Sequence, residues 1–378
     1  MNPLLVGLFW SLWLLNFSSR MVLSPVLPLI EDQLQLSHGQ AGSLFTFIAM
    51  GYTITSVLAG LISLRTGYNR AILASTVIVL TALFFLQYAT SYLSLALFVF
   101  FIGIGTGLYM PSVVPIVTST FDRQTWGKAL AIVDTGASVG IFLVPIFTVI
   151  AVRSFYWRTL FLFLSGAWAV ALMLFWKFAP DPRPQKVENA QLFQVLRRRE
   201  FWIVFLLWIL ATASVVGLYS IIPLFLVKEK GMPLEMANTV FGISRAGGIC
   251  VSILGGYLAD RYGAKRVLFF VLSITGISTI GIALAQNFPL LVAMLVIEAS
   301  ACTGFFPVGY AAISKLTSLE ERGMFVGIVM AAGVLFGHGL TPALLGATAD
   351  AFSFQSGILV LGCLTTLCCL SLRKLPKV

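Results

Sequence analysis

The sequence predicts an all-α membrane protein in which twelve transmembrane helices form two pseudo-symmetric six-helix bundles. The first observation is composition, because 59% of the residues are hydrophobic, only 10% are charged, and the mean hydropathy is +0.98. A soluble domain of this length has too little interior to bury so many apolar side chains. The second is that the charged residues lie mostly between long apolar runs, as membrane helices require. The third is that landmark residues recur at a constant offset of 196 along the chain.

Twelve apolar runs are long enough to cross a hydrocarbon core of ~30 Å as helices. The first run begins at Pro3 with no basic leader before it and no small-residue cleavage site after it, so we expect an uncleaved helix. The sixth should end before Pro182 and Pro184, because two prolines in four residues break a helix. The predicted spans are 4–29, 41–63, 71–90, 93–119, 128–151, 158–178, 201–226, 236–258, 266–286, 289–314, 322–345 and 353–372.

These spans divide the chain into an N-terminal six-helix bundle over 1–178, a cytoplasmic linker over 179–200 and a C-terminal six-helix bundle over 201–378. The linker carries Arg197-Arg198-Arg199, which suits the anionic inner leaflet. The other loops are short, so no soluble domain is expected. The sequence also lacks the phosphate-binding pattern Gly-x-x-x-x-Gly-Lys-Ser/Thr, so neither a nucleotide nor another cofactor is predicted.

The basic residues indicate how the chain is oriented in the membrane. The formal net charge is +10, yet of the 24 Lys and Arg only Arg153, Arg158, Lys228 and Lys230 lie on the side opposite the termini. This asymmetry follows the positive-inside rule and predicts cytoplasmic termini, in a bacterial inner membrane. The basic excess therefore records orientation and does not predict a nucleic-acid partner. The expected partners are the lipid bilayer, a small solute and its coupling ion, and the chain is expected to be monomeric.

The repeat is clearest where the second and third helices of each half meet. Residues 60–67 read GLISLRTG, and residues 256–263 read GYLADRYG. Phe45 and Pro111 have counterparts in Phe241 and Pro307 at the same offset. In so apolar a chain, a duplicated unit is typical of secondary transporters built from two parallel halves.

The stretch from Gly256 to Lys265, with its preceding glycine, closely resembles the loop motif between helices two and three of the major facilitator superfamily. The turns at 123–127 and 320–323 resemble the second repeated turn of that family. The resemblance covers the whole chain and implies a gating role, in which the motif acid pairs with a neighbouring helix and closes the cytoplasmic side. Leu64 occupies the position of that acid in the first half. The gating residues implied are Gly60, Arg65, Gly256, Asp260, Arg261 and Gly263.

Two arginines, Arg20 and Arg245, fall within predicted spans, each ~14 Å below the outer surface at 1.5 Å per residue. A charge at mid-bilayer costs roughly 2.5–3.5 kcal/mol, so each should face a cavity or a partner. They are not repeat-equivalent, which favours a role in substrate binding over a structural ion pair, the alternative. Two guanidiniums from opposite bundles could each hold a carboxylate through paired hydrogen bonds. Asn16 and Ser24 place polar groups on the helix face of Arg20, and Tyr219 is a candidate apolar wall.

Three further polar residues within spans are candidates for coupling transport to an ion. Glu298 is predicted at a depth similar to Arg245, either as a proton-carrying carboxylate or as a static partner of that arginine. Asp134 lies ~9 Å into the fifth span and could serve coupling or a structural pairing. His338 lies between two glycines in the eleventh span and could titrate near neutral pH or hydrogen-bond in the interior.

A cation in helix one with an arginine in helix eight resembles the monocarboxylate and organic-anion branches of the superfamily. The resemblance implies a secondary transporter of a small organic anion, working by proton symport or anion exchange. A drug or cation exporter of the same fold, with Glu298 and Asp134 facing the substrate, is the first alternative, and a non-transporting sensor is the second. The five cysteines lie in apolar segments without metal-ligand spacing, and no nucleophile–base pair is present, so neither a metal site nor an enzyme is expected.

Overall fold

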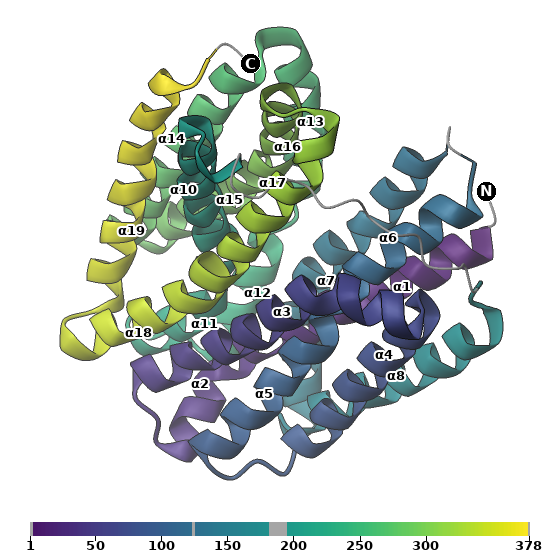
Figure 1. Ribbon diagram of the computed structural model, residues 1–378. Coiled ribbons are helices and arrows are strands. Elements are labelled where there is room, and N and C mark those ends of the chain that lie inside the picture. The colour runs from purple at the N-terminus through teal and green to yellow at the C-terminus, as the bar shows by residue number, and fades with distance from the viewer. Residues whose placement is uncertain (1–2, 123–124, 181–194, 377–378) are drawn as a thin grey trace. The chain divides into compact units, whose positions relative to one another are not determined.

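The computed structural model describes residues 3–122, 125–180 and 195–376, and every regular element within these ranges is a helix (Figure 1). The all-α prediction is confirmed for these residues. The helices of the N-terminal half are α1 (Pro3–Met21), α2 (Leu23–Leu34), α3 (His38–Thr66), α4 (Tyr68–Leu86), α5 (Tyr92–Gly107), α6 (Tyr109–Thr120), α7 (Trp126–Ser154) and α8 (Thr159–Phe178).

The helices of the C-terminal half include two π-helical stretches, η1 and η2, and end in a 3₁₀ helix, η3. In chain order they are α10 (Arg199–Thr212), η1 (Ala213–Leu218), α11 (Tyr219–Lys228), α12 (Leu234–Ser244), α13 (Gly248–Tyr262), α14 (Ala264–Leu284), α15 (Phe288–Thr303), α16 (Phe305–Leu316), α17 (Leu319–Ala332), η2 (Gly333–Leu340), α18 (Thr341–Ala351), α19 (Phe354–Cys368) and η3 (Cys369–Lys374).

The chain forms two compact units. One comprises residues 1–36 and 44–187, and the other comprises 37–43 and 188–378. Most of the predicted linker, 179–200, lies outside the described residues, as do Arg123 and Gln124 of the predicted repeated turn. That domain boundary therefore stays a prediction.

The predicted count of twelve spans does not hold as a count of long helices. Among the described residues, eleven helices are long and apolar enough to cross a membrane. The eighth predicted span, 236–258, is missing because it is broken into α12 and α13, with Arg245, Ala246 and Gly247 in the turn between them. At the same offset, Ala49 lies inside the continuous helix α3. Glycine at both 247 and 248, where the first half has Gly51 and Tyr52, weakens the helix at this point.

Each unit is held together by helices that are far apart in sequence. In the N-terminal unit α1 packs along α7, and α4 packs against both α5 and α8. In the C-terminal unit α14 lies beside α19 (Figure 1). Trp208 of α10 is buried there and meets the rings of Phe305 and Tyr310 at 5.4 and 5.0 Å between centroids. These pairings bury apolar faces that the isolated helices would expose.

The two copies of the repeated loop have the same backbone conformation. Gly67 and Gly263 are separated by 196 residues, and their φ angles are +91° and +87°. Non-glycine residues rarely adopt this region, so glycine at this place is required by the sharp turn between two helices. The repeat seen in the sequence therefore has a direct structural counterpart in each unit.

Two π-helical stretches pack against each other in the C-terminal unit. Within η1, a Cβ added to Gly217 would lie 2.4 Å from the carbonyl oxygen of Gly337 in η2. A Cβ added to Gly337 would lie 2.7 Å from the backbone nitrogen of Ala213 and from the carbonyl oxygen of Ile209. The two backbones are therefore in direct contact, which only glycine permits. π-Helical stretches are uncommon and occur frequently at functional sites.

We expect Gly337→Ala to lower stability, because the new methyl group would meet backbone atoms that cannot move independently. Overpacking of this kind costs roughly 1–3 kcal/mol. Gly327→Ala is the matched control in the same predicted span, since its Cβ would meet nothing within 4 Å. Alanine is the better helix former, so Gly327→Ala should keep or raise stability. The apparent melting temperatures of the purified proteins test this, and an unchanged value for Gly337→Ala would contradict the close contact.

Candidate functional site

Arg20 is a buried cation near the end of α1, with 4% of its surface exposed. Its guanidinium carbon lies 4.2 Å from the ring centroid of Phe17 and 4.8 Å from that of Tyr52 on α3. Its Nε and Nη2 have no hydrogen-bond partner, and no carboxylate of a described residue forms an ion pair with it. A buried guanidinium is stabilised by aromatic faces, but its N–H donors still need acceptors. This arrangement leaves donors available to an anion.

The polar residues predicted around Arg20 are all buried, but they have separate roles. Asn16 donates from Nδ2 to the carbonyl oxygen of Thr106 on α5 at 3.0 Å, while its Oδ1 has no hydrogen-bond partner. The hydroxyl of Ser19 accepts the indole N–H of Trp168 on α8 at 2.8 Å. Ser24 lies within α2, and Val22, which joins α1 to α2, keeps helical dihedral angles, so the predicted common face with Arg20 stays a prediction. Asn16 and Ser19 therefore hold α1 against its neighbours.

Asp134 on α7 is exposed and contacts α1 through tryptophan. The indole N–H of Trp13 donates to its Oδ1 at 3.3 Å, and that of Trp10 donates to Thr135 at 3.0 Å. The Trp13 ring is stacked on Tyr109 at 5.5 Å and lies 6.0 Å from the Arg20 guanidinium. Trp13 is therefore in contact with Asp134 on one side and with the surroundings of Arg20 on the other. The coupling role of Asp134 stays a prediction.

Arg245 occupies the turn between α12 and α13 and is 6% exposed. Its guanidinium carbon lies 5.0 Å from the ring of Tyr219 and 5.6 Å from that of Phe241. Its Nη2 is 3.8 Å from Oε2 of Glu298, which is near the limit for an ion pair, and its Nε has no hydrogen-bond partner. Arg245 therefore lies at a break in the eighth predicted span, and discontinuous helices commonly form the substrate sites of transporters.

Glu298 on α15 is completely buried, and neither of its carboxylate oxygens has a hydrogen-bond partner. Its long contact with Arg245 is its one ion pair within the part of the chain that the structure describes. Cys302 follows one turn later on the same helix face and is also buried. A buried carboxylate held by so loose a pairing can exchange its partner for a proton with little rearrangement. The predicted proximity of Glu298 to Arg245 is present in the structure.

An arginine–tyrosine contact occurs in each unit, with the two residues exchanged between the helices. In the N-terminal unit the arginine is on the first predicted span and Tyr52 on the second. In the C-terminal unit Tyr219 is on the seventh span and the arginine on the eighth. Sequence reasoning included Tyr219 but missed Tyr52 and Phe17. Phe17 could have been found by its spacing of three residues from Arg20 along one helix, whereas Tyr52 carried no local signal.

The remaining predicted residues are His338, which is buried, and the gating residues of the two repeated loops. His338 is buried in η2, on the π-helical stretch that packs against η1. Asp260 and Arg261 are exposed at the end of α13, where the Arg261 guanidinium lies 5.4 Å from the Tyr262 ring. Arg65 is exposed at the end of α3. A side chain on Gly60 or Gly256 would meet nothing within 4 Å, so packing does not require glycine there. The gating roles stay predictions.

Among the described residues, no group of three His, Cys, Asp or Glu side chains is placed to hold a metal ion. Instead, each unit buries one arginine beside aromatic rings, and the C-terminal unit also buries a loosely paired carboxylate. Spanning helices with buried charges and a broken helix define a class of protein, the polytopic carriers of polar solutes.

The chain belongs to the Major Facilitator Superfamily, which matches residues 9–284 and 235–378. It is 24% identical over 285 residues to the hexuronate transporter of Bacillus subtilis, covering 71% of this chain and 67% of that one. It is also 24% identical over 336 residues to the nitrite extrusion protein of the same organism, covering 85% and 81%. The protein is an integral, multi-pass membrane protein and a secondary transporter, not an enzyme.

The fold agrees with that of solved transporters. A bacterial homologue of the human lysosomal transporter Spinster, crystallised in an inward-facing and occupied conformation, aligns with 99% of this chain and 97% of its own. The TM-score is 0.84 and the sequence identity is 17%. At this identity the likeness concerns the fold alone.

Proposed function

We propose that this protein carries a small organic anion with a carboxylate group across the membrane by alternating access. The observation that carries the proposal is that each unit buries one guanidinium whose N–H groups are not all used. Arg20 has two such nitrogens, Nε and Nη2, and no ion pair to a described residue, while Arg245 has one, Nε, and a loose ion pair. A carboxylate accepts two parallel hydrogen bonds from a guanidinium, so it is the ligand that this geometry suits.

The surroundings of the arginines support an organic anion over a bare inorganic one. Phe17 and Tyr52 flank Arg20, and Tyr219 and Phe241 flank Arg245. Aromatic faces give apolar contact area to a carbon skeleton while they stabilise the cation. The name of the hexuronate transporter describes a substrate with such a skeleton and a carboxylate. This similarity supports the assignment of the same chemical class to this chain.

The proposal includes the coupling and the cellular setting. Glu298 is proposed to take part in proton symport, since it is the buried acid nearest to an available guanidinium. Anion exchange without proton movement is the other mode compatible with this site. The basic residues favour cytoplasmic termini, and the bacterial relatives favour a bacterial inner membrane. The working unit is proposed to be the monomer.

Uptake into proteoliposomes tests the proposed function. Labelled glucuronate should enter liposomes that contain the protein with saturation, and other small carboxylates should compete. Liposomes with the purified protein denatured before reconstitution are the control for leakage. Competition by lipophilic cations alone would contradict the proposal and favour the cation exporter. Binding without uptake of any solute would favour the sensor.

A second candidate is the transport of an inorganic anion. The similarity to the nitrite extrusion protein extends over more of this chain than the similarity to the hexuronate transporter. A planar oxyanion can also accept two hydrogen bonds from a guanidinium. The same proteoliposomes distinguish the two candidates, because nitrite transport without carboxylate transport would favour the inorganic anion.

A further inference from the structure

A groove with a cavity volume of about 760 Å³ lies on the C-terminal unit, between α13, α14 and α15. Its walls are apolar and exposed, and they include Phe270, Ile274 and Ile297. Both Arg266 and Tyr262 line the groove where α13 turns into α14. The groove is therefore apolar along its length and carries a cation at one end.

The basic side chains near this turn differ in whether they already interact with other residues of the chain. The ammonium of Lys265 donates to the carbonyl oxygens of Arg373 and Leu375, and the Arg261 guanidinium lies 5.4 Å from the ring of Tyr262. Arg266 is exposed and forms no hydrogen bond or ion pair with any residue that the structure describes. Its guanidinium is therefore available to an anionic group at the end of the groove.

The dimensions of the groove match one layer of a bilayer. From Arg266 to Ile274 the groove follows eight residues of α14, which corresponds to ~12 Å of helix. Half of a ~30 Å hydrocarbon core is ~15 Å. A molecule with an anionic headgroup at Arg266 and a hydrocarbon chain against Phe270 and Ile274 would therefore lie at the depth of a lipid in one leaflet.

We propose that this groove is a binding site for one anionic phospholipid, with the phosphate on Arg266 and an acyl chain between α13, α14 and α15. Charge complementarity selects this occupant, because an arginine near the membrane surface attracts anionic lipids. The phenol of Tyr262 lies at the same end, where amphipathic rings favour the headgroup level. The inference is independent of the proposed substrate, since none of the groove residues belongs to the candidate anion site.

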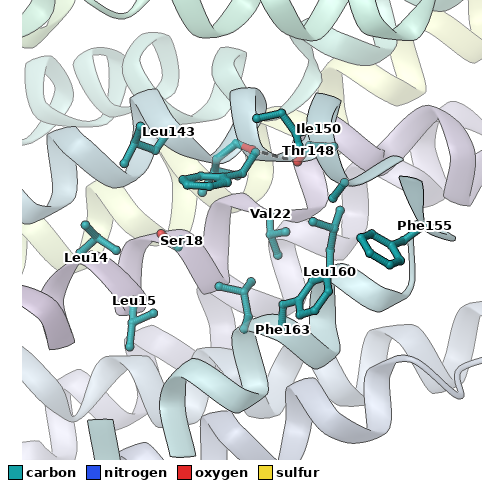
Figure 2. Close-up of a pocket in the computed structure, with 14 residues that line it drawn as sticks. Leu14, Leu15, Ser18, Val22, Leu143, Thr148, Ile150, Phe155, Leu160 and Phe163 are labelled. Carbon is teal, nitrogen blue, oxygen red and sulfur yellow. Dashed lines mark hydrogen bonds between the residues drawn. The ribbon is translucent and has the colours of Figure 1, made fainter. Parts of the chain in front are cut away.

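The N-terminal unit has a second apolar groove, which has no cation in its lining. It is formed by α1, α7 and α8, and Leu14, Leu143 and Phe163 are among its apolar walls (Figure 2). Its polar side chains are Ser18 and Thr148, and the Thr148 hydroxyl donates to the carbonyl oxygen of Val144 at 2.8 Å. No charged side chain lines it. This groove is expected to accept acyl chains without selecting a headgroup.

The repeat supplies a matched control for the arginine. Arg70 lies 196 residues before Arg266, at the start of α4, and is also exposed. It lines neither of the two grooves. An effect of charge alone would appear at both positions, whereas binding in the groove would depend on Arg266 only.

Native mass spectrometry of the full-length protein with added phosphatidylglycerol or phosphatidylcholine tests the proposal. The wild type should retain phosphatidylglycerol in preference, and Arg266→Gln should weaken that binding about fivefold. Arg70→Gln should leave it unchanged. Filling the groove with Ile274→Trp should reduce binding, whereas Ile150→Trp in the other groove should preserve the preference. Unfolding temperatures of all variants establish that each is folded.

Three outcomes would overturn the proposal. Equal losses in Arg266→Gln and Arg70→Gln would indicate a diffuse effect of positive charge. Unchanged binding in Ile274→Trp would mean that no acyl chain occupies the groove. Displacement of the lipid by millimolar glycerol 3-phosphate would mean that the headgroup alone is recognised.

Discussion

Arg20→Gln and Arg245→Gln should each weaken anion binding by at least about 100-fold, because loss of one partner of a buried charge pair costs roughly 3–5 kcal/mol. The amide keeps polarity but removes the charge. Arg→Lys should also weaken binding, since an ammonium cannot form the planar pair of hydrogen bonds. Calorimetric titration of the purified protein with glucuronate measures the affinity.

The two substitutions should differ in their effect on stability. Arg20 has no ion pair to a described residue, so Arg20→Gln removes an uncompensated buried charge and should keep or raise the melting temperature. Arg245→Gln removes the ion-pair partner of the buried Glu298 and should lower it.

Arg158→Gln is the control for loss of a structural arginine. Its Nη1 donates to the carbonyl oxygens of Gln87 and Ala89, so it ties the loop after α4 to the start of α8. This variant should be less stable yet bind the anion with unchanged affinity. Unchanged affinity in Arg20→Gln or Arg245→Gln would remove that residue from the site.

Glu298→Gln should keep anion binding and counterflow exchange but lose accumulation driven by a pH gradient. When an incoming anion pairs with Arg245, Glu298 loses its partner at 3.8 Å and can accept a proton. The amide imitates the protonated side chain and cannot release a proton. Exchange and gradient-driven uptake are measured in the same proteoliposomes, so a loss of folding would affect both.

Glu229→Gln is the matched control in the same unit. Its carboxylate accepts the backbone N–H groups of Phe354 and Gln355 and so caps α19. This variant should lose stability and keep pH-driven accumulation. Loss of binding in Glu298→Gln would make Glu298 a structural partner of Arg245. A wild-type transport rate that does not change with an imposed pH gradient would favour anion exchange.

Local sequence patterns predicted the helices well because each span must satisfy its own backbone hydrogen bonds in lipid. The second predicted span, 41–63, lies within α3, which covers 38–66. The eighth predicted span is not a single helix. Hydropathy did not reveal the break, because the residues around it are mostly apolar. The turn at Arg245 depends on glycines whose effect on an apolar run cannot be read from hydropathy.

The sequence predicted those site residues whose charge is costly to bury in a membrane. It did not predict the residues that join the site through contacts between distant helices. Arg20, Arg245 and Glu298 could be predicted because a charged side chain inside a membrane span is costly and therefore indicates a binding or pairing role. Tyr52 was missed because its contact with Arg20 depends on how α3 lies against α1. The sequence also did not predict that the two arginines differ in their ion pairs. Glu298 pairs with Arg245, whereas Arg20 has no carboxylate partner among the described residues.

The sequence by itself determined that this chain crosses the membrane repeatedly, that it consists of a duplicated unit, and that a few charges lie within its spans. These properties follow from composition, periodicity and the cost of burying charge, which each segment carries alone. Only the tertiary structure decided which aromatic rings cover each arginine, where the eighth helix breaks, and that Arg266 ends an apolar groove. The physical reason is that packing between distant helices depends on the shapes of both partners, and a single segment specifies only its own.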